Sequence, residues 1–140
     1  MPQSNANLFV ALRAAFPQRL DETAIETDGG LSYSWRDLDR ATAMMANLLE
    51  SLELPAGSRI AVQVEKSVEA VMLYLATLRA GFVFLPLNTA YQSAALEYFI
   101  CNAEPAAAVC SSKNLGPVST IAFKAGPKNR FTPAPDHYRP

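Results

Sequence analysis

The sequence predicts an α/β fold in which a parallel sheet, built by strand–helix alternation, follows an N-terminal helix and a β-hairpin. From residue 59 onward, short runs of strand-forming residues alternate with helical patterns, an order typical of parallel sheets with helical crossovers. Of the 140 residues, 50% are apolar and 18% are charged, and the mean hydropathy is +0.06. This composition suits a packed core and argues against a disordered chain.

The N-terminal elements are predicted from periodicity and capping residues. Apolar residues at helical spacing indicate a helix over residues 7–16, which Pro17 ends. Residues 24–33 are interpreted as a hairpin, in which Asp28-Gly29 is expected to supply the positive φ angles of a tight turn. Ser34 with Asp37 three residues later is a capping-box pattern, so a helix is expected to begin there and to end before Pro55.

Three buried strands are predicted at residues 59–64, 82–85 and 106–110. The helix between the first two runs from Ser67 to about residue 80 and is apolar nearly all round, so we expect it to be buried on more than one side. The run 82–85 is continuously apolar and is therefore predicted to be a central, parallel strand. A further helix is expected from residue 92 to Pro105, and a weaker helical pattern covers residues 118–124.

Charge and proline content change near the C-terminus. Residues 1–112 carry seven basic and twelve acidic side chains, whereas residues 113–140 carry five basic side chains, one acidic side chain and half of the ten prolines. We therefore predict that residues 1–128 are the folded part and that 129–140 form a proline-rich disordered tail, without a helix or a central strand.

The composition excludes several classes of function. A formal net charge of −1 offers no global basic field for nucleic acid, and no apolar run approaches the ~18 residues that would cross a membrane. The N-terminus lacks the pattern of a secretory signal, and two cysteines are too few for a disulfide scaffold or a zinc site. We therefore expect a cytoplasmic protein with no nucleic-acid or membrane partner.

The usual catalytic residues are scarce. The single histidine, His137, lies in the proline-rich tail, and neither of the common glycine-rich phosphate loops occurs. Three polar segments directly follow the predicted strands, at residues 65–67, 88–91 and 111–113, where ligands gather in parallel sheets. Such segments are more often solvent-exposed helix caps than ligand-binding sites, so the residues alone do not identify a function.

Several segments resemble one family. Residues 31–38, LSYSWRDL, and the run 74–88, YLATLRAGFVFLPLN, are similar to the AMP-forming acyl-CoA synthetases of the adenylate-forming superfamily. Residues 65–70, EKSVEA, and 88–91, NTAY, are most similar to malonyl-CoA synthetases. The resemblance covers about residues 7–131.

This resemblance implies an ATP-dependent malonate–CoA ligase, in which the acid reacts with ATP to give an acyl-adenylate and pyrophosphate, and coenzyme A then displaces AMP. Magnesium offsets phosphate charge in the first step. The family's phosphate loop, catalytic lysine and carboxylate-binding arginines have no counterpart in these 140 residues. The chain is therefore interpreted as an incomplete N-terminal portion of the adenylate-forming fold, inactive alone, with no catalytic or metal-binding residue and no tight binding of ATP, CoA or Mg.

The family also implies weak candidates for contact with coenzyme A, which are Asn88, Thr89 and Lys113. The alternative interpretation is a self-contained small α/β module that binds a ligand or partner without catalysis. The two differ in the completeness of the core, because a fragment should leave apolar faces uncovered and should tend to self-associate. The residues do not identify the acid.

Overall fold

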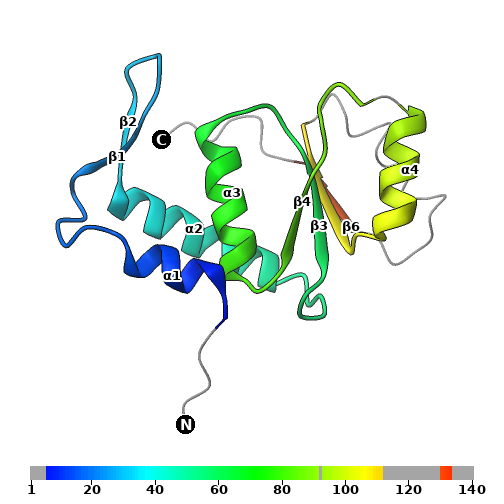
Figure 1. The fold of residues 1–140 in the computed structure, drawn as a ribbon, viewed down its shortest axis with the longest axis horizontal. Helices are drawn as coiled ribbons and strands as arrows, with labels where there is room; N and C mark the ends of the chain where they lie inside the picture. The colour runs from blue at the N-terminus through cyan, green and yellow to red at the C-terminus, as the bar shows by residue number, and fades with distance from the viewer. Residues whose placement is uncertain (1–5, 92, 112–129, 134–140) are drawn as a thin grey trace, which may run out of the picture. The chain divides into compact units, whose positions relative to one another are not determined.

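The computed structural model describes residues 6–91, 93–111 and 130–133 and confirms a mixed α/β fold with a parallel sheet (Figure 1). The chain divides into two compact units. The first comprises Met1–Glu53 and Ser67–Phe82, and the second comprises Leu54–Lys66 and Val83–Pro140. Each unit is described separately below.

The first unit contains three helices and a hairpin, which are α1 (Leu8–Ala14), β1 (Thr23–Glu26), β2 (Ser32–Ser34), α2 (Trp35–Glu50) and α3 (Val68–Arg79). Each helix begins at a polar cap, because the first amide groups of a helix lack partners within it. The side chains of Asn7, Ser34 and Ser67 accept hydrogen bonds from the backbone at Phe9, Asp37 and Ala70 respectively. At α2 the predicted capping box is confirmed, since the Asp37 carboxylate also accepts from the Ser34 amide.

The hairpin turn differs from the sequence prediction in its geometry. Strands β1 and β2 are antiparallel as expected, but only Gly30 of the turn residues has a positive φ, of 82°. The Gly30 amide donates to the Thr27 carbonyl, and Thr27 and Leu31 pair through the Thr27 amide. A β-turn followed by one left-handed residue is the usual three-residue hairpin loop, so the prediction of positive φ at Asp28-Gly29 is wrong.

The second unit is organised around a four-stranded sheet in the order β4-β3-β5-β6. The strands are β3 (Arg59–Gln63), β4 (Val83–Pro86), β5 (Ala107–Cys110) and β6 (Arg130–Pro133), and all three neighbouring pairs are parallel. In the register Ile60 pairs with both Phe84 and Ala107. The expected parallel three-stranded core between residues 59 and 110 is therefore confirmed.

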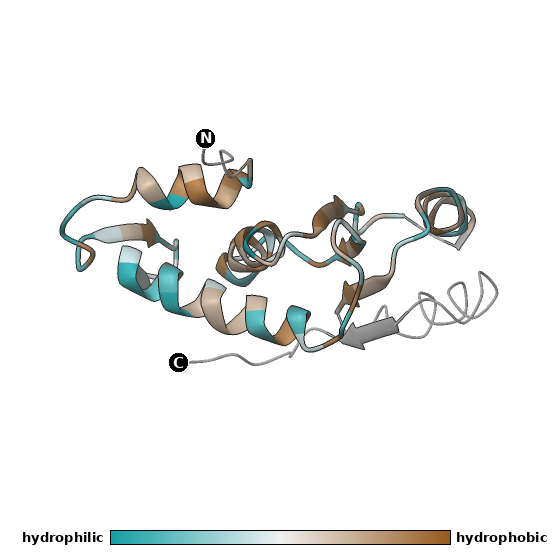
Figure 2. Cartoon of the chain, turned by 90° about the horizontal axis from the view of Figure 1, so that it is seen from below, coloured by the Kyte–Doolittle hydropathy of each residue, from teal (hydrophilic) through white to brown (hydrophobic). Residues whose placement is uncertain are grey.

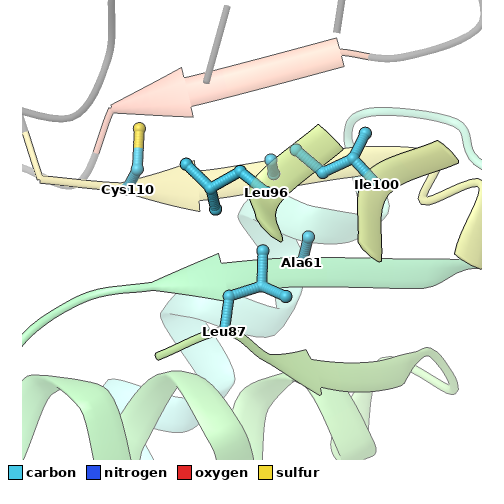
Figure 3. Close-up of a cluster of buried hydrophobic side chains, with 6 residues drawn as sticks. Ala61, Leu87, Leu96, Ile100 and Cys110 are labelled. Atoms are coloured by element: carbon cyan, nitrogen blue, oxygen red, sulfur yellow. The ribbon is translucent and has the colours of Figure 1, made fainter. Parts of the chain in front are cut away.

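An apolar cluster joins one face of this sheet to α4 (Ser93–Ala103). Leu96 and Ile100, one helical turn apart, point from α4 toward Ala61 of β3 and Cys110 of β5, with Leu87 beside them (Figure 3). Ile100 and Ala61 are almost fully buried. The predicted helix before Pro105 is thus confirmed as α4, and the carboxyl end of the sheet lies beside the loop that leads into this helix.

The structure differs from the sequence predictions in two places, which are the position of β4 in the sheet and the conformation of residues 130–133. Strand β4 lies at one edge of the described sheet, whereas β3 and β5 each have neighbours on both sides, and β3 has four consecutive buried residues. A continuous apolar run therefore did not identify the central strand. Residues 130–133, predicted to be disordered, form β6 at the other edge, where a terminal proline is tolerated because it need not donate to a neighbour. The predicted helix over 118–124 and the rest of the tail lie outside the described residues.

The all-round burial predicted for α3 is only partly observed. Met72, Ala76 and Thr77 are buried, but Val71 is 45% exposed and Tyr74 is 37% exposed. Hydropathy colouring shows α3 as largely apolar, whereas α2 is polar toward both ends (Figure 2). Within the part of the chain that the structure describes, no helix is long and apolar enough to cross a membrane.

Candidate functional site

The candidate site is the carboxyl edge of the parallel sheet in the second unit. Chain segments leave β3, β4 and β5 at this edge, at Glu65–Lys66, Asn88–Tyr91 and Ser111. The strand order places β4 and β5 on opposite sides of β3, although β4 follows β3 in the chain. The connections therefore diverge at β3, and ligands of open α/β sheets bind at the carboxyl ends beside such a point.

Hydrogen bonds hold the loop after β4 in a defined turn. The Asn88 carbonyl accepts from the Tyr91 amide and from Gln63 Nε2, both at 3.0 Å, and Asn88 Oδ1 accepts from the Ala90 amide at 2.9 Å. The Tyr91 ring stacks on Phe99 of α4 with 5.0 Å between ring centroids. Asn88 is exposed and Thr89 is half-buried, so the amide hydrogens on Asn88 Nδ2 and the Thr89 hydroxyl are neutral donors that this turn can offer to a ligand.

Gln63 is the residue at this edge that the sequence analysis did not single out. It ends β3, is 2% exposed and ties the strand to the Asn88 turn. A polar residue within the otherwise apolar run 60–64 was the available signal. Its Oε1 and the Ser111 hydroxyl are the two buried side-chain polar atoms without a hydrogen-bond partner among the described residues.

The Cys110 thiol at this edge is not a reactive nucleophile. Burial raises the pKa of the Cys110 thiol, so it remains protonated and unreactive. No group of three or more metal-ligating side chains occurs in the described ranges, so these residues do not form a magnesium site by themselves. Asn88 and Thr89 lie in the same turn, and Lys113 lies outside the described residues.

Comparison with known proteins identifies the family. The sequence profile described as AMP-binding enzyme matches residues 12–133. Among relatives, the medium-chain fatty-acid–CoA ligase of Escherichia coli K12 is 32% identical over 103 residues, which are 72% of this chain and 18% of that protein. The hybrid PKS-NRPS synthetase pydA of an Acremonium species is 28% identical over 86% of this chain but only 3% of its own length.

Solved structures share the fold. Apo MatB from Rhodopseudomonas palustris matches with a TM-score of 0.83 and 43% identity, covering 92% of this chain and 26% of that chain. A benzoate CoA ligase from Burkholderia xenovorans LB400 matches with a TM-score of 0.80 at 21% identity. The chain thus spans about a quarter of these two structures. The predicted resemblance to adenylate-forming enzymes of the malonyl-CoA synthetase type is confirmed by the family profile and by the 43% identity to MatB. Because the profile matches most of its length, the chain belongs to the AMP-binding enzyme family.

Proposed function

We propose that the chain provides the N-terminal part of an ATP-dependent malonate–CoA ligase, which converts the acid, ATP and coenzyme A to acyl-CoA, AMP and pyrophosphate. The supporting observation is a contrast between fold and sequence. MatB and the benzoate ligase match the fold almost equally, with TM-scores of 0.83 and 0.80, but their identities are 43% and 21%. Identity beyond what the shared fold requires favours the malonate branch.

Within this function, Asn88 and Thr89 are proposed to lie against coenzyme A, with Lys113 as a further candidate. The Asn88 turn presents neutral donors at the carboxyl edge of a parallel sheet, where they suit carbonyl and phosphate oxygens. Gln63 would then position the turn through its bond to the Asn88 carbonyl. Bound coenzyme A would supply the thiol that accepts the acyl group.

The chain alone is proposed to be inactive, because the family's phosphate loop and catalytic lysine have no counterpart in its sequence. Isotope exchange between pyrophosphate and ATP in the presence of malonate measures the first half-reaction directly. We expect a rate equal to the blank without protein. A rate above the blank that depends on malonate would show that this chain carries catalytic groups of its own.

A covalent chimera tests the proposed function. The segment of R. palustris MatB that matches this chain is replaced by the present sequence, and malonyl-CoA formation is measured. We expect the chimera to form malonyl-CoA, which requires the present sequence to replace the N-terminal part of MatB. A chimera that folds but forms no malonyl-CoA would contradict the proposal.

The same chimera tests the role of the Asn88 turn. Asn88→Ala should raise the KM for coenzyme A several-fold while leaving pyrophosphate exchange unchanged, because coenzyme A enters only in the second step. Asn102→Ala, at an exposed position of α4, is the matched control and should change neither quantity. Equal KM values for the two variants would remove Asn88 from the site.

A further inference from the structure

Gln63 holds a buried hydrogen-bond acceptor that the described residues leave unused. The residue ends β3 and is 2% exposed, and its Nε2 donates to the Asn88 carbonyl at 3.0 Å. Its Oε1, on the same amide group, has no hydrogen-bond partner among the described residues. Leaving a buried polar atom unpaired costs free energy, so native proteins normally provide a partner. The unused oxygen therefore points to a donor that the described residues do not supply.

An apolar side chain would suit this position better on grounds of packing. Side chains alternate along a strand, so Gln63 lies on the same face of β3 as Ala61. It pairs in register with Cys110, and Ala61 and Cys110 both belong to the apolar cluster that joins the sheet to α4 (Figure 3). Residues that break a packing rule in this way are typical of functional sites. We therefore assign the Gln63 amide to ligand binding.

The polar groups at this edge suit an amide better than a phosphate. Asn88 is exposed and its Nδ2 can donate, whereas Gln63 Oε1 can only accept. A secondary amide matches both groups, because it has one N–H and one carbonyl oxygen, but a phosphate offers mainly acceptors and would leave Oε1 unpaired. The charged side chains in the described loops of this edge, Glu65 and Lys66, have opposite signs and give a phosphate no net attraction.

We propose that Gln63 and Asn88 together bind one secondary amide of the ligand. Gln63 Oε1 accepts from the amide N–H, and Asn88 Nδ2 donates to the amide carbonyl oxygen. The inference rests on the proposed function, in which the ligand is coenzyme A. It assigns this edge to the pantetheine arm, which contains two secondary amides, and not to the phosphates of the nucleotide.

The contacts of the Asn88 turn allow Gln63 to reach such a ligand. Its Oε1 is buried in this structure, so the Gln63 side chain must turn away from the Asn88 carbonyl. That carbonyl also accepts from the Tyr91 amide at 3.0 Å, and Asn88 Oδ1 accepts from the Ala90 amide at 2.9 Å. Releasing Gln63 therefore leaves the turn closed and its carbonyl paired.

A shortened thiol substrate tests the contact in the chimera with R. palustris MatB. Pantetheine retains both amides but lacks the nucleotide and every phosphate. Gln63→Met should raise the KM for coenzyme A and for pantetheine by the same factor, about three- to tenfold for one lost hydrogen bond. Pyrophosphate exchange, which precedes the thiol, should be unchanged, and the midpoint of urea unfolding should not decrease. Gln18→Met, the same substitution at an exposed position of the first unit, is the matched control and should change none of these quantities.

Ester analogues of pantetheine test the donor itself, because in each of them an oxygen replaces one amide N–H. One of the two analogues should have the same raised KM with the unchanged chimera as pantetheine has with Gln63→Met. That analogue should lose nothing further in the Gln63→Met variant. If neither analogue has a raised KM, no amide N–H is recognised and the inference is wrong.

The remaining outcomes separate this inference from the proposed function. A rise in KM for coenzyme A alone would place the nucleotide at this edge, and no rise for either thiol would exclude Gln63 from the site. A parallel loss of pyrophosphate exchange would show a structural role instead. A chimera that forms no malonyl-CoA counts against the proposed function. Calorimetric binding of pantetheine to that chimera then decides the inference, and equal dissociation constants with and without Gln63→Met overturn it.

Discussion

Asp39 connects all three helices of the first unit. Its carboxylate on α2 accepts hydrogen bonds from Arg13 of α1 at 3.2 Å and from Arg79 of α3 at 3.0 Å, and the Arg79 guanidinium also lies 4.8 Å from the centre of the Phe9 ring. Burial by itself would raise the pKa of Asp39, but the hydrogen bonds from Arg79 and Arg13 outweigh it and lower the pKa below its usual value. The pair of arginines therefore stabilises the fold only while Asp39 is ionised.

Replacing Asp39 should show how much its ion pairs contribute to the free energy of unfolding. Asp39→Asn is expected to reduce the free energy of unfolding by about 1–2 kcal/mol at pH 7, since the side chain is only partly exposed. The control Asp21→Asn removes the ion pair with Arg36, in which the Asp21 carboxylate is 83% exposed, and it should have little effect because water screens the pair. Urea unfolding measures both, and equal losses would contradict the role given to Asp39.

The same pair predicts a pH dependence. Because the folded pKa of Asp39 lies below the unfolded value of about 3.9, the unfolded chain binds the proton first as pH decreases. The Asp39 contribution is therefore complete above that unfolded value and is lost as pH falls through the folded pKa. The difference in stability between the unchanged chain and Asp39→Asn should accordingly decrease as pH falls below the unfolded pKa, and a difference that does not depend on pH in this acid range would exclude this explanation.

Replacing Gln63 with an apolar residue is expected not to lower the free energy of unfolding, which is unusual for a buried position. Gln63→Met removes one hydrogen bond, worth about 1 kcal/mol, but it also removes a buried Oε1 without a partner, which costs about 1–3 kcal/mol. The Asn88 carbonyl keeps its bond from the Tyr91 amide. We expect Gln63→Met to be neutral or stabilising in urea unfolding, and Gln63→Glu to be strongly destabilising because it buries a charge.

At the scale of elements, the sequence predicts those features that depend on interactions between residues close together in the chain. The sequence correctly predicts the helix starts at Ser34 and Ser67 and the helix α4. A capping side chain and the apolar spacing of a helix both involve residues only a few positions apart. The order of strands was not predictable in this way. Strand β3, with Gln63 at its end, is an inner strand and β4 is an edge strand although β4 has the more apolar sequence, because the order of strands is determined by contacts between distant segments.

The capping box of α2 offers a test at this scale. Ser34→Ala should lower the free energy of unfolding by about 1 kcal/mol, since the Asp37 amide loses its acceptor at the start of the helix. Ser32→Ala is the control, because its hydroxyl makes only a 3.4 Å exposed contact with Thr23. Thermal unfolding followed by circular dichroism measures both variants, and an equal effect at the two positions would contradict the capping argument.

For the molecule as a whole, the family could be predicted from the sequence, whereas the site could be predicted only in part. Motifs such as residues 74–88 are contiguous in the chain, so they can be recognised without a fold. Asn88 and Thr89 are candidates because they follow a predicted strand and because the family resemblance implies them, but Gln63 acquires its role only when β3 and the turn after β4 lie side by side. Contacts between distant parts of a chain are difficult to predict from its sequence alone.

Each unit exposes apolar side chains, and this predicts how the isolated chain behaves. Val71 in the first unit and Val83 and Tyr98 in the second are between 45% and 65% exposed. At about 25 cal/mol per Å², an uncovered patch on the order of 300 Å² forgoes about 7 kcal/mol, which is comparable to the ~5–15 kcal/mol stability of an entire domain. We therefore expect a marginally stable chain that binds a hydrophobic dye and self-associates in light scattering. A monodisperse monomer with a sharp, cooperative melt and no dye binding would instead support the self-contained module.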